Sequence, residues 1–124
     1  MIGELWVTIS PFYDSIKKCN SFKKRPVLII GVADSGDYNV LPISRVTRRQ
    51  YLDPAYDIPI KQKDCPLLNL TADSYVRVHK QTTVNCSSVT SKIGSLKADY
   101  PQLFLEIMTK LQEYNEKLYS EAGI

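Results

Sequence analysis

Seven apolar residues recur at three- and four-residue spacing near the C-terminal end of this 124-residue chain. They are Leu103, Phe104, Ile107, Met108, Leu111, Tyr114 and Leu118. This spacing puts them on one face of a helix, which we expect from about Tyr100 to Ser120. Asp99 is suited to cap its N-terminus, and Pro101 is tolerated in its first turn. Because an apolar helical face must be covered by another layer, the helix predicts a sheet or helices for it to pack on.

The remaining sequence supplies a sheet rather than further helices. Short runs of β-forming residues alternate with Pro, Gly and Asp, which predicts strands at residues 2–10, 27–30, 38–43, 56–60, 74–80, 82–84 and 92–96. Pro11 is expected to end the first strand, residues 11–25 and 61–73 to form loops, and residues 87–91 to form one helical turn. The chain is therefore expected to form a single domain, residues 1–124, mainly β with some α: a small open β-barrel with a C-terminal helix.

The whole chain has a net charge of +3, and its basic residues are concentrated in the first half. One cluster holds Lys17, Lys18, Lys23, Lys24 and Arg25, and a second holds Arg45, Arg48 and Arg49. Such a distribution is compatible with a polyanionic partner such as nucleic acid. A solvated basic loop would give the same pattern, so charge alone leaves both interpretations open.

Several classes of protein do not fit this sequence. There is no apolar run of membrane-spanning length, and the first residues lack the basic region and long apolar stretch of a secretory signal. The three cysteines form no CxxC pair, and His79 is the only histidine. We therefore expect a cytoplasmic protein with no metal site, no cofactor and no disulfide framework.

Two residues stand where predicted strands meet polar segments. Arg25 precedes Pro26 and an apolar strand, a position from which a guanidinium can clamp a phosphate with two hydrogen bonds. Ser44 follows the apolar run at residues 40–43. An ordinary surface cation and an ordinary turn residue would look the same. His79 likewise fits either a functional or a structural role on the polar face of its strand.

Five segments, taken in order, resemble the PemK/MazF toxin family over nearly the whole chain. The most specific is Lys24-Arg25-Pro26-Val27-Leu28-Ile29-Ile30, which resembles the RPxLV signature. The others are Gly3-Glu4-Leu5-Trp6 with Pro11, Val40-Leu41-Pro42-Ile43-Ser44, Ser74-Tyr75-Val76-Arg77-Val78 and Lys92-Ile93-Gly94-Ser95-Leu96.

The resemblance implies an SH3-like barrel, a homodimer, sequence-selective cleavage of single-stranded RNA and an antitoxin partner. It makes Arg25 the catalytic arginine and Ser44 the catalytic hydroxyl residue. Cleavage would proceed without a metal, by attack of the RNA 2′-hydroxyl on the adjacent phosphate, leaving a 2′,3′-cyclic phosphate and a 5′-hydroxyl. We expect further RNA contacts from Lys17, Lys18, Lys23, Lys24 and Phe22, and from His79, Lys80 and Gln81.

The chain departs from the family pattern at two places. Residues 11–25 lack the usual Gly-x-Glu, and Thr82 stands where an arginine is usual. Two other functions therefore remain open. One is a CcdB-like toxin, which shares the barrel but binds gyrase and cuts nothing. The other is an RNA-binding barrel without catalytic activity, which the loss of the arginine at Thr82 would favour.

Overall fold

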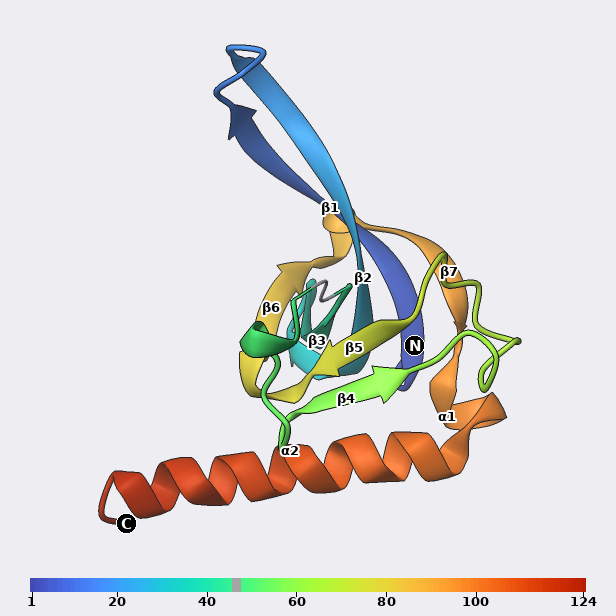
Figure 1. Cartoon of the computed structure of the whole chain (residues 1–124). Helices are drawn as coiled ribbons and strands as arrows, with labels where there is room; N and C mark the ends of the chain where they lie inside the picture. The colour runs from blue at the N-terminus through green and yellow to red at the C-terminus, as the bar shows by residue number, and fades with distance from the viewer. Residues whose placement is uncertain (46–47) are drawn as a thin grey trace.

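A curled antiparallel sheet and one long C-terminal helix make up the fold in the computed structural model, which describes residues 1–45 and 48–124 (Figure 1). The predicted fold class, mainly β with a C-terminal helix, is confirmed. The elements are β1 (Glu4–Asp14), β2 (Cys19–Asp34), β3 (Asp37–Ser44), η1 (Arg49–Tyr51), β4 (Asp57–Ile60), β5 (Ser74–Arg77), η2 (Val78–Lys80), β6 (Thr82–Asn85), η3 (Cys86–Ser88), β7 (Val89–Ser95), α1 (Leu96–Asp99) and α2 (Pro101–Glu121).

The sheet curls around its central strand, β2, which pairs with β1 on one side and with β3 on the other. On the outer sides β7 pairs with β1 and β6 pairs with β3, although only η3 separates β6 from β7 in the chain. Register shifts between Leu5 and Trp6, and between Ile29 and Gly31, mark bulges, which increase the local twist. The sheet therefore closes partway into a half-open barrel.

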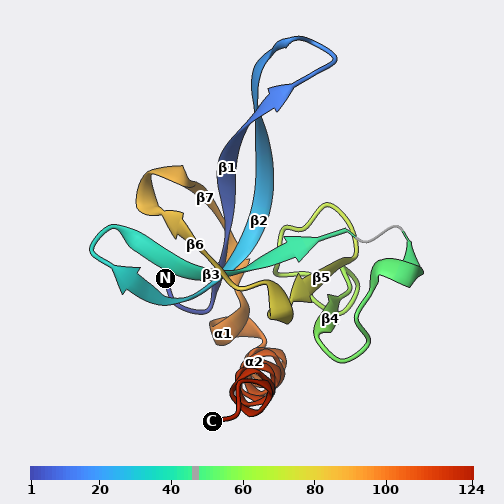
Figure 2. The same ribbon diagram turned by 90° about the vertical axis from the view of Figure 1, so that its left-hand side faces the viewer.

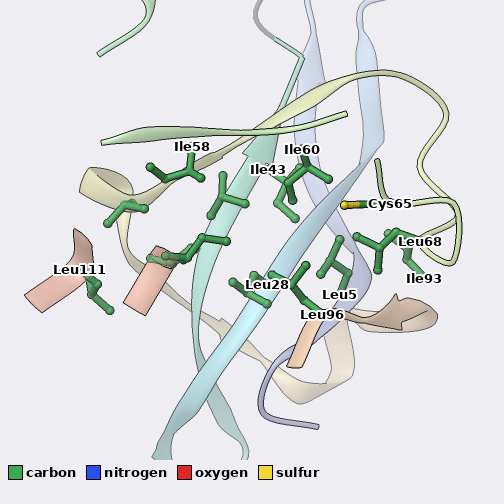
Figure 3. Close-up of a cluster of buried hydrophobic side chains, with 14 residues drawn as sticks. Leu5, Leu28, Ile43, Ile58, Ile60, Cys65, Leu68, Ile93, Leu96 and Leu111 are labelled. Carbon is green, nitrogen blue, oxygen red and sulfur yellow. The ribbon is translucent and has the colours of Figure 1, made fainter. Parts of the chain in front are cut away.

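The main core lies between this barrel and α2, as Figure 3 shows for the cluster that contains Leu5, Leu28 and Leu111. Strand alternation sends Leu5 and Leu28, which are direct partners, to the same face. Ile107 and Leu111 of α2 are buried against the same cluster. The periodicity of the C-terminal segment thus identified the correct helix and its buried face.

Residues 11–25 are not the loop that the sequence predicts. They extend β1 and β2 into a two-stranded ribbon, with partners from Thr8–Arg25 out to Asp14–Cys19. Pro11 does not end β1: the pairing of β7 with β1 stops at Thr8, so the outer edge of β1 at Pro11 has no strand that needs its missing N–H. Asp14 Oδ1 accepts the backbone N–H groups of Ile16 and Lys17, at 2.9 and 3.1 Å, and so shapes the turn.

The start of the C-terminal helix also differs from the prediction. Ser95, not Asp99, provides the capping side chain: its hydroxyl accepts the Ala98 N–H at 3.2 Å at the start of α1. Asp99 is the last residue of α1, and α2 begins at Pro101 without a side-chain cap. The turn into α2 is therefore made by a separate short helix that the apolar spacing does not reveal.

Besides the lengthening of β1 and β2, the largest differences from the predicted strands are at residues 74–80 and 92–96. The segment at residues 74–80 divides into β5 and the short helix η2, and the last strand begins at Val89 rather than at Lys92. The helical turn expected at residues 87–91 is η3, which is shorter and begins at Cys86. Among the described residues, no helix is long and apolar enough to cross a membrane.

Candidate functional site

Strand β3 changes its pairing partner near its C-terminal end. It pairs with β2 as far as Val27–Pro42, and its next two residues, Ile43 and Ser44, pair with β5 instead. Because β3 leaves β2 at this point, a gap opens between the end of β3 and the part of β2 that continues into the ribbon. Arg25 and Ser44 line one pocket there, with a volume of about 380 Å³. The structure thus brings the two sequence-predicted catalytic residues together.

The lining of this pocket, which we call the β2–β3 pocket, is positively charged. Of the nine described residues that line it, three are cationic and none is acidic. Ser44 and Thr71 contribute hydroxyl groups, whereas the Ser74 hydroxyl already donates to the Ala72 carbonyl oxygen at 2.9 Å. Guanidinium groups and hydroxyl donors without a competing carboxylate suit an oxyanion such as a phosphate. The nine residues are Lys24, Arg25, Pro26, Ile43, Ser44, Arg45, Leu70, Thr71 and Ser74.

Arg25 combines a fixed backbone with an accessible side chain. Its partner across the ribbon is Thr8, whose side chain is almost fully buried and whose hydroxyl donates to the Arg25 carbonyl oxygen at 3.0 Å. The Arg25 residue itself is exposed. A guanidinium on such a support can reach a ligand without any rearrangement of the strand.

The four predicted RNA-binding lysines all lie on or at the tip of the ribbon, which projects from the end of the barrel opposite α2 (Figure 2). Lys24 lines the pocket, and Lys23 places its Nζ 4.7 Å from the centre of the Phe12 ring. Lys17 and Lys18 lie in the turn that precedes Cys19. Cys19 is six positions, or roughly 20 Å of strand, away from Arg25.

Phe22 lies on the ribbon opposite Pro11 and is 68% exposed. An aromatic ring of this kind is free to stack on a flat ligand. Lys23, Lys24 and Phe22 therefore lie on the stretch of β2 next to Arg25, with successive side chains on opposite faces of the ribbon.

His79, Lys80 and Gln81 lie apart from this pocket. His79 and Gln81 line a second pocket of about 370 Å³ beside Tyr114 of α2, and it shares no lining residue with the first. Lys80 is exposed and belongs to neither lining. The structure does not bring these three residues to Arg25.

His79 instead belongs to a buried charged cluster around Asp57. The Asp57 side chain is fully buried; it accepts Arg77 Nε at 3.0 Å and the Asp53 N–H at 2.7 Å. His79 Nδ1 lies 3.8 Å from the same carboxylate and is itself buried without a hydrogen-bond partner. Sequence reasoning assigned no role to Asp57 or Arg77, because nothing in the sequence shows that β4 and β5 are neighbours.

The comparisons with known proteins agree with this geometry. A family model for PemK-like, MazF-like toxins of type II toxin-antitoxin systems matches residues 5–114. No curated protein matches the chain.

Three of the solved structures of similar fold are mycobacterial proteins. The Mycobacterium tuberculosis toxin MazF-mt6 is 20% identical, with a TM-score of 0.53 over 86% of this chain and 96% of that one. An endoribonuclease from a mycobacterial species, solved in complex with its cognate antitoxin, is 15% identical, with a TM-score of 0.61 over 94% of this chain and 92% of that one. A further structure, of an endoribonuclease from a mycobacterial species, is 16% identical, with a TM-score of 0.59 over 94% of this chain and 90% of that one.

At these identities the structures show a shared fold, whereas the family model covers almost the whole of this chain. The chain therefore belongs to the family of PemK-like, MazF-like toxins of type II toxin-antitoxin systems.

Proposed function

We propose that this chain is the toxin of a type II toxin-antitoxin pair and a sequence-selective endoribonuclease that cleaves single-stranded RNA without a metal. The observation that carries the proposal is the lining of the β2–β3 pocket, where Arg25 and Ser44 meet among three cations and no carboxylate. The family and the endoribonucleases of similar fold support the same reaction class.

The reaction needs little covalent chemistry from the protein. The RNA 2′-oxygen attacks the adjacent phosphorus, the bond from phosphorus to the 5′-oxygen breaks, and the products are a 2′,3′-cyclic phosphate and a 5′-hydroxyl. The 2′-hydroxyl gives up one proton and the leaving 5′-oxygen gains one, so no water is consumed in this step. The protein has to align the strand and to stabilise negative charge on the phosphoryl oxygens.

Arg25 and Ser44 divide this work in the proposed mechanism. A guanidinium remains protonated at all physiological pH values, so Arg25 acts as a charge-stabilising donor rather than as a base. The Ser44 hydroxyl donates a hydrogen bond to the scissile phosphate. None of the nine described lining residues is a carboxylate or an imidazole, so the proton acceptor is water or the RNA itself. His79 lines the other pocket and is not the base in this scheme.

The RNA approaches along the ribbon in this proposal. Lys23 and Lys24 neutralise backbone phosphates next to the pocket, and Phe22 stacks on an unpaired base. Lys17 and Lys18 are proposed as more distant contacts at the tip. His79, Lys80 and Gln81 remain proposed RNA contacts only for a strand long enough to reach the second pocket.

The family supports the biological setting that we propose. The proposed toxin acts in the cytoplasm as a homodimer and is neutralised by a cognate antitoxin. The mycobacterial endoribonuclease of similar fold was solved with its antitoxin, which supports a protein partner of this kind.

The deciding experiment incubates the purified protein with a long single-stranded RNA in the presence of EDTA. Sequencing the new 5′ ends identifies the cleavage motif, and chemical analysis of the new 3′ ends detects the cyclic phosphate. Binding without cleavage would indicate the RNA-binding barrel instead. Inhibition of gyrase, with the RNA left intact, would indicate the CcdB-like toxin.

A further inference from the structure

Arg45 lies in the β2–β3 pocket directly after Ser44, and the catalytic assignment of Arg25 and Ser44 leaves it without a role. We propose that Arg45 is a second phosphate-binding arginine, which contacts the same phosphodiester as Arg25 from the other side of the pocket. The proposal rests on the proposed function for its ligand, single-stranded RNA.

The two arginines belong to different walls. Arg25 lies on β2, whereas Arg45 follows the end of β3 and its Nη2 donates to Thr71 Oγ1 at 3.1 Å. Thr71 is in the segment between β4 and β5, which has no hydrogen-bonded pairing with β2. The hydrogen bond to Thr71 therefore fixes the Arg45 guanidinium to a different segment from the strand that carries Arg25.

The support for Arg45 is itself fixed. Gln62 Nε2 donates to the Leu70 carbonyl oxygen at 2.6 Å, and the Gln62 backbone N–H donates to Asp73 Oδ1 at 2.9 Å. These two bonds hold the chain on both sides of Thr71. A side chain supported in this way is pre-organised for a ligand, as a binding or catalytic group has to be. Thr71 is thus a positioning residue for Arg45.

The electrostatics of the pocket call for an anion between the two walls. Arg25, Arg45 and Lys24 share one pocket whose described lining holds no negative charge. A phosphodiester has two non-bridging oxygens, so each guanidinium can donate to one of them. As the 2′-oxygen attacks, negative charge on these oxygens grows, and two fixed donors stabilise that growth more than one does. Arg45 therefore contributes to catalysis as well as to binding.

The test compares Arg45→Gln with Arg48→Gln, which removes the same charge from an exposed arginine three residues away that does not line the pocket. Binding is measured by fluorescence anisotropy on a labelled single-stranded RNA whose methylated 2′-hydroxyls prevent cleavage. Arg45→Gln should weaken binding and lower the salt slope by about 0.7, as the loss of one phosphate contact on a single strand does. Arg48→Gln should leave both unchanged.

The cleavage arm uses the unmodified RNA. Arg45→Gln should slow cleavage by roughly a hundredfold, the usual cost of one lost charge-stabilising donor. Arg45→Lys should restore little of this rate, because an ammonium lacks the planar fork. Thr71→Val should shift the rate in the direction of Arg45→Gln, and Thr71→Ser, which keeps the hydroxyl, should restore it.

A phosphorothioate at the cleavage site separates contact from mere structural support. Arg45→Gln should abolish the slowing caused by the diastereomer that places sulfur where Arg45 donates, and should leave the slowing caused by the other diastereomer, whose sulfur faces Arg25, unchanged. Equal behaviour of Arg45→Gln and Arg48→Gln in binding and cleavage would overturn the proposal. If the parent protein binds the methylated RNA but does not cut the unmodified RNA, the proposed function fails. The binding measurements still decide whether Arg45 contacts a phosphate. If it binds no RNA, both fail.

Discussion

The hydroxyl of Thr8 donates a hydrogen bond of 3.0 Å to the carbonyl oxygen of Arg25, joining β1 to β2 at the base of the ribbon. Thr8 is only 3% exposed, so this bond is shielded from water and fixes the strand at the point where the Arg25 side chain leaves it. The backbone at Arg25 is thus held by interactions that do not involve its guanidinium.

We therefore predict that Arg25→Ala abolishes cleavage without unfolding the protein. Removing one charge-stabilising donor should lower the rate by on the order of a hundred- to a thousandfold. The exposed side chain leaves no cavity, so the melting temperature should match that of the parent chain. Arg25→Lys should recover little activity, because lysine cannot make a bidentate contact. An alanine variant that cuts at the parental rate would show that the site lies elsewhere.

The ribbon lysines form two pairs that carry equal charge at different distances from the pocket. A Lys23→Gln/Lys24→Gln variant should bind cognate and non-cognate RNA more weakly by a similar factor, since phosphate contacts do not read sequence. The salt slope should fall by roughly 0.7 for each lost contact. Lys17→Gln/Lys18→Gln, at the tip, serves as the matched control and should have the smaller effect. Identical salt slopes in both variants and the parent would place the RNA path off the ribbon.

The ion pair between the buried Asp57 carboxylate and the partly buried Arg77 guanidinium should be important for stability. Arg77→Met leaves the Asp57 carboxylate buried without its cation, and we expect the free energy of unfolding to fall by about 3 kcal/mol. Asp57→Asn in the Arg77→Met background should cost much less than it does alone, because the uncompensated charge is then gone. Urea denaturation of the two single variants and the double variant measures this coupling, and strictly additive losses would contradict it.

Glu4 provides a prediction of pH dependence. The indole N–H of Trp6, at 3.0 Å, and the Lys92 ammonium, also at 3.0 Å, hold the pKa of the Glu4 carboxyl below its ordinary value of 4.5. A carboxyl with a lowered pKa in the folded state adds stability above pH 4.5, and this contribution is lost as the pH falls through the folded-state pKa.

Glu4→Gln should therefore be less stable than the parent chain at neutral pH, with the difference shrinking in acid. The fluorescence of Trp6, the single tryptophan, reports the unfolding. Glu106→Gln, on the exposed side of α2, controls for the loss of a negative charge. A gap between Glu4→Gln and the parent that stays constant across the acid range would argue against the Glu4 contacts.

The homodimer that the family resemblance implies remains a prediction, and the exposed residues of α2 are the candidates for its interface. Phe104, Met108 and Leu111 contact the barrel core, whereas Leu105 and Tyr119 of α2 are about 60% exposed. If α2 carries the interface, Leu105→Glu/Tyr119→Glu should be a monomer at concentrations where the parent is a dimer. Light scattering at micromolar concentration decides this, and a monomeric parent would contradict the prediction.

Local sequence patterns predicted the elements whose buried positions show in the spacing of apolar residues within one segment. The period of α2 and the apolar run at Val27 to Ile29 show directly which residues are buried. The ribbon escaped prediction because its residues are polar and exposed: a two-stranded ribbon outside the core needs pairing, not apolar alternation. The pairing of β1 with β2 depends on the length of both strands and on their register, and neither strand's sequence shows these alone.

The same distinction applies to the site. Arg25 and Ser44 were predicted from a strand boundary and a family resemblance, each on its own segment. Thr71 and the Asp57–Arg77 pair escaped because their importance arises only when the segment before β5 meets β3 and when β4 meets β5. Their partners lie far away in the sequence, and no local spacing shows which distant side chain will satisfy them.

The switch of β3 from β2 to β5 places the two sides of the pocket on separate parts of the fold. The side of the pocket that carries Thr71 leads into β5, the strand that pairs with β3 through Ile43–Val76 and Ser44–Tyr75. The segment between β4 and β5 is anchored elsewhere, by the Asn69 side chain on the Ile93 carbonyl oxygen and by the buried Leu68, and Thr71 itself is exposed. Insertions or substitutions in that segment can widen or narrow the pocket while Arg25 and Ser44 stay on their own strands. If the proposed function holds, remodelling this one surface segment changes which RNA the pocket accepts without rebuilding Arg25 and Ser44.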